Sequence, residues 1–358
     1  MTDPDTTTSS PGSAKRVRIG LAVTALIGAL GMGLYLGAGL VHISQLEAGR
    51  VAALSSAEHA ALIRAATGVG GSLLDVNSSF AAQGTSGAGT GIVVADGNIV
   101  VTNNHVIAGA TFITATSPST GVTYPATVLG YDRVHDVAVI QLRGASGLRP
   151  ITWGSGSIGD AVVGVGNKGG QGATYASPGR IIATGATIHA ADSLTGATEI
   201  LHGLLATNAP VGAGDSGGPL LDEHGHVVGL DVASGTLRHS TIGYAIPSAR
   251  VREVLAAVLS GHSSGSVHVG ATAHLGVLID PRWRGRGARV VGVLAGPVAG
   301  LLKPGDVITA LAGMAVTSSG TLSSDLESLS VGARVPLTWQ RGSTTEHSTI
   351  TLDAGPAL

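Results

Sequence analysis

The stretch GAGDSGGPL at residues 212–220 decides how the rest of the chain is interpreted. It places Ser216 among glycines directly before an apolar run, so that both the hydroxyl and the backbone can be exposed. A serine hydroxyl is a weak nucleophile unless a base takes its proton, and its adduct requires N–H groups aimed at the developing oxyanion. Ser216 is therefore the candidate nucleophile, with the N–H groups of Gly214 and Ser216 as the candidate oxyanion hole. Such a loop alone is more often only a turn, so partners must be found elsewhere.

Two upstream segments supply candidate partners for this serine. In VTNNHVI, residues 101–107, His105 lies at the end of an apolar strand, which is a rigid place to hold a base. In YDRVHDVAVI, residues 131–140, Asp136 leads into a buried strand, from which a carboxylate could orient the imidazole and stabilise its cation. The order of the three candidates along the chain is therefore His, Asp, Ser.

Neighbouring residues offer alternative assignments. His135 could compete as the base, but adjacent side chains of a strand face opposite ways, which predicts that His135 lies on the surface. Asp132 could be the acid, but it precedes the apolar strand in an expected turn, where a carboxylate is usually solvated. His224 and His226 have metal-ligand spacing, yet DEHGH is typical of a hairpin tip.

The composition narrows the classes of function. The formal net charge of −2 with 20 Lys and Arg gives no broad basic field, so nucleic acid is not expected as a partner. The absence of cysteine excludes disulfides, thiolate metal sites and a cysteine nucleophile. Hydrophobic residues make up 44% and aromatic residues 3%, and 56 glycines suit many tight turns between short strands of Val, Leu and Ile. No metal or cofactor is required by any motif.

Short β-branched runs separated by turns begin near residue 86 and suggest a pair of β-barrels. Residues 247–260 switch to a helical pattern, and a polar linker follows at 261–266. The apolar positions expected on one face of that helix are Val251, Val254, Leu255, Val258 and Leu259. Beyond the linker, strands return, with helices expected around 298–302 and 322–329.

The blocks TNNH, DVAV and DSGGP, in this order, resemble those of the chymotrypsin-fold serine proteases and specifically the HtrA/DegP-like branch, closest to its secreted or membrane-anchored actinobacterial members. The resemblance covers roughly residues 70–355. It implies a mainly β protein with a chymotrypsin-like double β-barrel over residues 67–260. It also implies that His105, Asp136 and Ser216 form a catalytic triad in the cleft between the barrels.

The chain departs from the pattern of that branch at two positions. Asp215 stands where the branch usually has Asn, and in trypsins this acid pairs with a new N-terminal ammonium after activation cleavage. Here Asp215 must find another partner, face water or await processing. Asn208 stands where the branch often has Asp, so the contacts of the activation loops are open.

The pocket for the substrate side chain is implied by the same resemblance. Its walls would come from residues 210–214, 230–234 and 242–246, which are mostly small or apolar. The branch favours small aliphatic side chains at the cleaved position, and this lining is compatible with that preference. Asp231 is the exception, because an inward carboxylate would favour a basic residue, whereas an outward one would be exposed.

The C-terminal part resembles a PDZ domain. The loop Leu275, Gly276 and Val277 resembles the carboxylate-binding loop of that α+β fold, and AGLLKPGDVI at 299–308 resembles its most recognisable internal block. In such domains an extended peptide adds to a sheet edge while backbone N–H groups receive its terminal carboxylate. Gly276 could instead only make a turn. We assign the PDZ domain to residues 267–355.

The N-terminal segment predicts how the chain is oriented across a membrane. Residues 19–41 carry no charge and are long enough to cross a bilayer as a helix. Lys15, Arg16 and Arg18 precede the run, so the positive-inside rule predicts a cytoplasmic N-terminus. We assign a disordered cytoplasmic tail to 1–18, one transmembrane anchor to 19–43 and a juxtamembrane helix or linker to 44–66. An uncleaved anchor is favoured over a signal peptide, whose apolar stretch is usually shorter.

Together these expectations describe a membrane-anchored, extracytoplasmic serine endopeptidase that cleaves unfolded or misassembled exported proteins through an acyl-enzyme. Its PDZ domain would bind peptide C-termini or regulate activity. Trimers are common in the branch, which makes a homotrimer a candidate assembly. The alternative is a catalytically silent anchored chaperone or scaffold, although a pure binding protein has no need for a triad. Natural substrates, activation and cleavage preference stay open.

Overall fold

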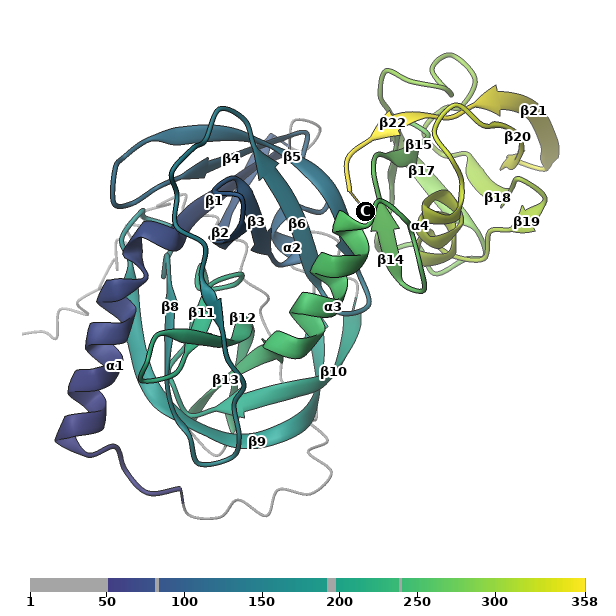
Figure 1. The fold of residues 1–358 in the computed structure, drawn as a ribbon. Coiled ribbons are helices and arrows are strands. Elements are labelled where there is room, and N and C mark those ends of the chain that lie inside the picture. Colours follow the sequence, from purple (N-terminus) through teal and green to yellow (C-terminus); the bar gives the residue numbers. More distant parts are fainter. Residues whose placement is uncertain (1–50, 81–83, 192–197, 238–239, 358) are drawn as a thin grey trace, which may run out of the picture.

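The computed structural model describes residues 51–80, 84–191, 198–237 and 240–357 (Figure 1). The expected cytoplasmic tail and the transmembrane anchor, residues 1–43, lie outside these ranges, as does the first part of the juxtamembrane segment. Within the described ranges, no helix has both the length and the apolar character needed to cross a bilayer.

A closed β-barrel forms the first half of the protease-like unit. Its strands are β1 (Leu73–Phe80), β2 (Thr85–Ala95), β3 (Ile99–Thr102), β4 (Phe112–Thr116), β5 (Thr123–Asp132) and β6 (Val137–Leu142). They run in the order β5-β4-β1-β2-β3-β6, and pairing of β5 with β6 closes the ring. The short helix α2 (Asn104–Ile107) follows β3 directly and carries the candidate base.

A second closed barrel follows in the chain. Its strands are β8 (Ala161–Gly166), β9 (Tyr175–Ala191), β10 (Thr198–Thr207), β11 (Pro219–Leu221), β12 (His226–Leu237) and β13 (Ser240–Pro247), with β7 (Thr152–Trp153) paired in parallel to β12. The order is β11-β8-β9-β10-β13-β12, and β11 pairs with β12 to close it. The mainly β fold with a closed, chymotrypsin-like barrel architecture is therefore confirmed.

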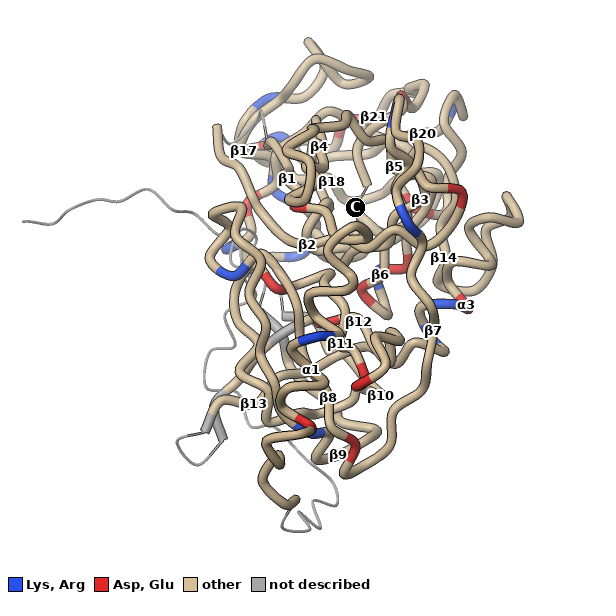
Figure 2. The backbone as a smooth tube through the Cα atoms, turned by 60° about the vertical axis from the view of Figure 1, so that its left-hand side comes forward, with Lys and Arg blue, Asp and Glu red and all other residues tan. Residues whose placement is uncertain are grey.

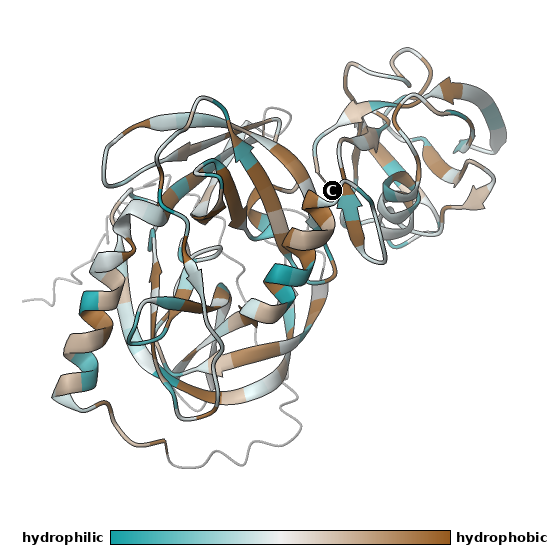
Figure 3. Cartoon of the chain, in the orientation of Figure 1, coloured by the Kyte–Doolittle hydropathy of each residue, from teal (hydrophilic) through white to brown (hydrophobic). Residues whose placement is uncertain are grey.

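Aliphatic side chains hold the barrels together. One buried cluster includes Ile92 and Val101 of the first barrel with Val163 and Leu230 of the second, so the barrels share a core. Figure 3 shows the hydrophobic positions concentrated in the barrel strands. Charged positions are sparse along the tube, and both signs are interspersed (Figure 2).

Helix α3 (Ser248–Leu259) packs across both barrels, against β12 and β13 of the second and β5 and β6 of the first, and its C-terminal end lies next to the C-terminal domain (Figure 1). The expected apolar face is confirmed for Val251, Val254, Leu255 and Val258, which are buried. Leu259 is 49% exposed, because it is the last helical residue and extends past the packed surface. The following strand β14 (Val267–Val269) pairs with β5 and extends the sheet of the first barrel.

The C-terminal unit is an α+β domain around its own core. It contains β15 (Thr272–His274), β16 (Val277–Ile279), β17 (Ala288–Val293), β18 (Val307–Leu311), β19 (Met314–Ala315), α4 (Ser319–Ser328), β20 (Arg334–Arg341), β21 (Thr344–Thr351) and β22 (Asp353–Gly355). The helix expected at 298–302 is wrong: these residues form a turn, with Gly300 at φ +79° and Pro304 just beyond. The helix expected near 322–329 begins earlier, where Ser318 and Thr321 form a reciprocal cap.

Helix α1 (Ser56–Gly68) and the 3₁₀ turn η1 (Gly70–Ser72) precede the first strand. The helix begins at a capping box in which Ser55 and Glu58 exchange hydrogen bonds. Its buried residues Leu62, Ala65 and Ala66 pack on the second barrel, mainly at β8 and β9. The segment is thus docked on the body of the protein and not only a spacer.

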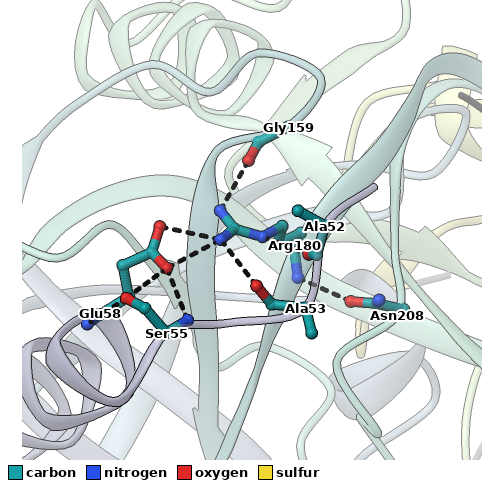
Figure 4. Close-up of polar contacts among 7 residues, drawn as sticks. All are labelled: Ala52, Ala53, Ser55, Glu58, Gly159, Arg180 and Asn208. Carbon is teal, nitrogen blue, oxygen red and sulfur yellow. Dashed lines mark hydrogen bonds and ion pairs between the residues drawn. The ribbon is translucent and has the colours of Figure 1, made fainter. Parts of the chain in front are cut away.

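Arg180 of β9 anchors the start of this helix (Figure 4). Its guanidinium donates to both carboxylate oxygens of Glu58 at 2.8 Å and to the carbonyls of Ala52 and Ala53. The backbone N–H of the same arginine donates to Asn208 Oδ1 at 2.7 Å. Arg180 therefore links the N-terminal segment to the strand end that leads toward Ser216.

Replacing Arg180 by alanine is predicted to loosen α1. Because Glu58 and the carbonyls before the helix lose their common donor, amide hydrogens of residues 56–68 should exchange several-fold faster, with little change in the C-terminal domain. Hydrogen exchange with mass spectrometry measures this. The matched control is Arg250→Ala, which removes an ion pair within α3 only. Equal exchange of α1 in both variants would contradict the anchoring role.

Candidate active site

His105 and Asp136 are joined by two hydrogen bonds. The ring Nδ1 lies 2.7 Å from Asp136 Oδ2, and the backbone N–H of His105 donates to Asp136 Oδ1 at 2.8 Å. The carboxylate is almost fully buried, and the imidazole is 12% exposed. This double contact fixes the ring orientation and leaves Nε2 as the edge of the imidazole that faces away from the acid.

The backbone around Asp136 is held in an unusual conformation. Its φ is +54°, in the left-handed region, and its carbonyl accepts a hydrogen bond from the Asn103 side chain at 2.9 Å. Asn103 is fully buried just before α2. Sequence reasoning did not single out Asn103, although its place in the TNNH block was a signal.

The turn before Asp136 overturns one expectation. Asp132 is 1% exposed and not solvated, because it accepts from the ring of His135 at 2.7 Å and from Ser266 at 2.8 Å. His135 turns away from the candidate site toward this acid, so it is not the base partner of Asp136. Asp132 therefore fixes the turn that leads to Asp136.

Ser216 lies on the loop between β10 and β11, where the second barrel meets the first. The carbonyl of Ser216 accepts from Thr90 N–H at 2.8 Å, and a Cβ placed on Gly89 would touch both that carbonyl and the Val106 side chain. Val106 is the neighbour of His105. Strand β2 thus contacts both the loop that carries Ser216 and the helix that carries His105.

Gly217 allows this close approach. It has φ +83°, and an added Cβ would collide with Thr90 O and Thr102 Oγ1. Its N–H donates to Asp231 O at 2.8 Å. Only glycine fits between the strands of the two barrels, so the DSGGP block is required by packing as well as by chemistry.

The candidate oxyanion groups lie on the same loop. Gly214 has φ +91°, and its neighbour Ala213 accepts from Gly169 N–H at 2.7 Å, which supports the loop from behind. Among the described residues, neither Gly214 N–H nor Ser216 N–H donates to a protein acceptor. Both are therefore available for an incoming oxyanion.

Asp215, next to the serine, points into the interior. Its Oδ2 accepts from Gly212 N–H at 2.8 Å, and its Oδ1 has no hydrogen-bond partner in the described part of the chain. Burial raises the pKa of this carboxyl to about 6, although the Gly212 contact and Lys168 act in the opposite direction. The structure thus shows that Asp215 does not face water and that hydrogen bonds within the described residues satisfy it only in part.

Asp231 also points inward. It is fully buried, and burial together with the nearby Asp215 raises the pKa of its carboxyl well above the ordinary value. Its backbone bonds the loop that carries Ser216. The Asp231 carbonyl accepts from Gly217 N–H and the Asp231 N–H donates to Gly218 O, both at 2.8 Å.

The residues of the expected peptide-binding loop lie between β15 and β16. Gly276 has φ +78°, and its carbonyl accepts from Leu294 N–H at 2.8 Å. Leu275 is buried, and Val277 begins β16, which is the edge strand of its sheet. An exposed edge next to a glycine turn is the geometry that strand addition needs.

Comparisons with known proteins agree with this arrangement. Residues 89–230 match the trypsin-like peptidase domain, and residues 273–352 match the PDZ domain. The serine protease PepD of Mycobacterium tuberculosis is 30% identical over 237 residues, covering 62% of this chain and 49% of PepD. The periplasmic serine endoprotease DegP of Salmonella typhimurium is 29% identical, covering 61% of this chain and 47% of DegP.

The chain is a homologue of the HtrA/DegP serine proteases. Among solved structures, the active form of the Rv3671c protease from M. tuberculosis has a TM-score of 0.52 and 26% identity, covering 64% of this chain and 98% of that one. The chain spans about half the length of the curated relatives quoted above. The mycobacterial PepD partly supports the expected closeness to actinobacterial members of this group.

Replacing Asp215 by asparagine is predicted to stabilise this HtrA/DegP homologue at neutral pH. The carboxyl binds its proton more tightly when folded, since its pKa moves from 3.8 to about 6, so this stability is complete in acid and lost as pH rises through about 6. Asparagine has no proton to lose. The variant should therefore gain up to about 3 kcal/mol at pH 7.5 and little near pH 4.

Urea unfolding of both proteins at the two pH values measures the difference. Asp96→Asn makes the same chemical change on an exposed turn, away from the buried carboxyl, and serves as the matched control. A loss of stability in Asp215→Asn at neutral pH would contradict the buried acid described here.

Proposed function

We propose that the chain is a membrane-anchored, extracytoplasmic serine endopeptidase with His105, Asp136 and Ser216 as its catalytic triad. The observation that carries the proposal is the His105–Asp136 pair, which orients an imidazole beside the loop that bears Ser216. The match to a trypsin-like peptidase domain and relatives that are named serine proteases support the same reaction.

In the proposed reaction, His105 Nε2 takes the proton of Ser216 as the hydroxyl oxygen attacks the peptide carbonyl carbon. The imidazolium that forms is stabilised by Asp136, whose contact with Nδ1 keeps that nitrogen protonated. The same proton then passes to the leaving amine, which leaves an acyl-enzyme. Water repeats the sequence with His105 as base and restores the serine.

The oxyanion of each tetrahedral adduct would be received by Gly214 N–H and Ser216 N–H. Donors that are already oriented stabilise this charge without reorganising, and losing one such donor typically slows an acyl transfer about 100- to 1,000-fold. The support of Ala213 by Gly169 N–H keeps the loop in position before substrate arrives.

The PDZ domain is proposed both to bind peptide C-termini and to regulate the triad. Its helix α4 contacts the β5–β6 turn, where Arg133 bonds Ser324 at 3.1 Å and pairs with Glu327 at 3.6 Å. The interdomain linker contributes the Ser266 bond to Asp132. These contacts hold the turn that ends at Asp136, so they connect the peptide-binding domain with the catalytic acid.

A second attachment reaches the base. The carbonyl of Ala357, after the last strand of the PDZ domain, accepts from Gly109 N–H at 2.7 Å, and its side chain is buried in the core of the first barrel. Gly109 follows closely after α2, the helix of His105. Both residues of the His–Asp pair thus receive support from the C-terminal domain.

The proposed location rests on the sequence and on the relatives. The uncharged run at 19–41 with preceding basic residues favours an anchor with the catalytic part outside, and DegP of S. typhimurium is named as periplasmic. Unfolded or misassembled exported proteins are the substrates this location would offer, and a homotrimer stays a prediction. The catalytically silent scaffold gains no support, since the quoted relatives are named proteases.

Ser216→Ala is predicted to abolish both fluorophosphonate labelling and degradation of an unfolded protein. The variant has no hydroxyl to attack a carbonyl or a phosphonate, so turnover should fall by about a thousandfold or more. Gel labelling and loss of unfolded casein measure the two signals in the full-length chain in detergent. Degradation that persists in the variant, or no labelling of a folded wild type, would contradict the proposal.

Ser266→Ala is predicted to lower kcat for a short peptide that does not reach the PDZ domain, with little change in KM. Losing one hydrogen bond to Asp132 destabilises the turn that positions Asp136 by about 1 kcal/mol. We therefore expect kcat to fall several-fold. Ser343→Ala, on an exposed turn of the PDZ domain, is the control. An unchanged kcat in Ser266→Ala would show that the linker contact with Asp132 does not reach the site.

A further inference from the structure

Asp231 is a buried acid whose carboxylate has nothing to bind. Its side chain has 0% exposure, and neither oxygen has a hydrogen-bond partner among the described residues. The next residue, Val232, accepts from the Ser216 hydroxyl at 3.3 Å through its carbonyl. Asp231 therefore comes directly before Val232, the residue that the candidate nucleophile contacts.

The three wall segments expected for the substrate pocket meet around Val211, beside this carboxylate. A Cβ on Gly164 would lie 2.8 Å from Asp231 Oδ2 and 2.9 Å from the Val211 side chain, and a Cβ on Gly243 would also lie 2.9 Å from Val211. Asp231 and Val211 come from two walls, Gly243 from the third, and Gly164 of β8 closes the group. Because two of these four residues are glycines, the Asp231 carboxylate is the main polar group among them.

Asp215 adds a second carboxylate on the same face of β8. A Cβ on Gly166 would lie 2.8 Å from its unpaired Oδ1. Gly164 and Gly166 are two residues apart in an extended strand, so the two acids lie beside positions roughly 7 Å apart on one face. The nearby cation is Lys168, but its Nζ donates to Pro210 O at 2.8 Å and not to either acid.

Two buried, incompletely bonded carboxylates are costly for a fold that could use asparagine or valine at either position. A bound organic cation would satisfy both, because it supplies several N–H donors and a compensating charge. The place of the acids behind the nucleophile loop indicates where that cation comes from. Asp215 directly precedes Ser216, and the Asp231 backbone bonds Gly217 and Gly218, so a side chain bound beside Ser216 lies close to both residues.

We propose that Asp231, with Asp215 beside it, forms the floor of the specificity pocket and selects lysine or arginine on the acyl side of the cleaved bond. This inference rests on the proposed endopeptidase function and names its substrate class. It replaces the small aliphatic preference implied by family resemblance. Since Asp231 is closed from solvent, entry of the basic side chain requires the packing around it, Val211 included, to move, and the acid to ionise.

Two peptides that differ only in Arg or Val before the cleaved bond test the selection. Wild type should favour Arg by about tenfold or more in kcat/KM, and Asp231→Asn should lower the Arg/Val ratio by about 10- to 100-fold, as for a lost charge-assisted contact. Asp96→Asn, on an exposed turn, should keep the wild-type ratio. A wild type that prefers Val, or an unchanged ratio in Asp231→Asn, would overturn the pocket.

Measurements on the wild type alone keep the test independent of the folding of the variant. Benzamidine, an aryl amidinium, should inhibit competitively, and its failure to bind a protein that fluorophosphonate labels would count against the basic pocket without touching the proposed function. If fluorophosphonate did not label the folded protein at all, the proposed endopeptidase function itself would be wrong. If activity toward both peptides appeared only after N-terminal truncation seen by intact mass, the acids would instead serve an internal ammonium, and the proposal would be wrong.

Discussion

The structure depends on the docking of the Gly214–Gly218 loop of the second barrel against strands β2 and β3 of the first. Thr90 binds the loop twice, through its N–H to Ser216 O and through its hydroxyl to Gly214 O, both at 2.8 Å. Gly217 lies against Thr102 and Thr90 at a distance no other residue allows. Because the proposed base His105 is held on the first barrel, this contact decides how the proposed nucleophile Ser216 is positioned relative to it.

The His–Asp half of the site is supported from outside the barrels. The turn that ends at Asp136 is fixed by Asp132 with His135 and Ser266, and Arg133 of that turn reaches α4. The helix of His105 is followed by a backbone bond to Ala357. Movement of the C-terminal domain at these points is expected to change the geometry of Asp136, the proposed catalytic acid, since its left-handed backbone depends on its surroundings.

Sequence reasoning found the fold class and the His105–Asp136 pair, because glycine spacing and strand ends are local properties that leave clear patterns. It did not find the burial of Asp132, since a turn carboxylate is recognised as buried only once its partner Ser266, far along the chain, is in place. The same holds for Arg180, whose partners come from the N-terminal segment. The helix expected at 298–302 was wrong because a short apolar run occurs in turns as well as in helices.

The most direct test of the account is a crystal structure of the chain after reaction with a fluorophosphonate. We predict phosphorus bonded to Ser216 Oγ, with one phosphonyl oxygen within about 3 Å of both Gly214 N and Ser216 N and with His105 beside the adduct. Attachment to another residue, or an oxygen directed away from both N–H groups, would contradict the triad and the oxyanion hole described here.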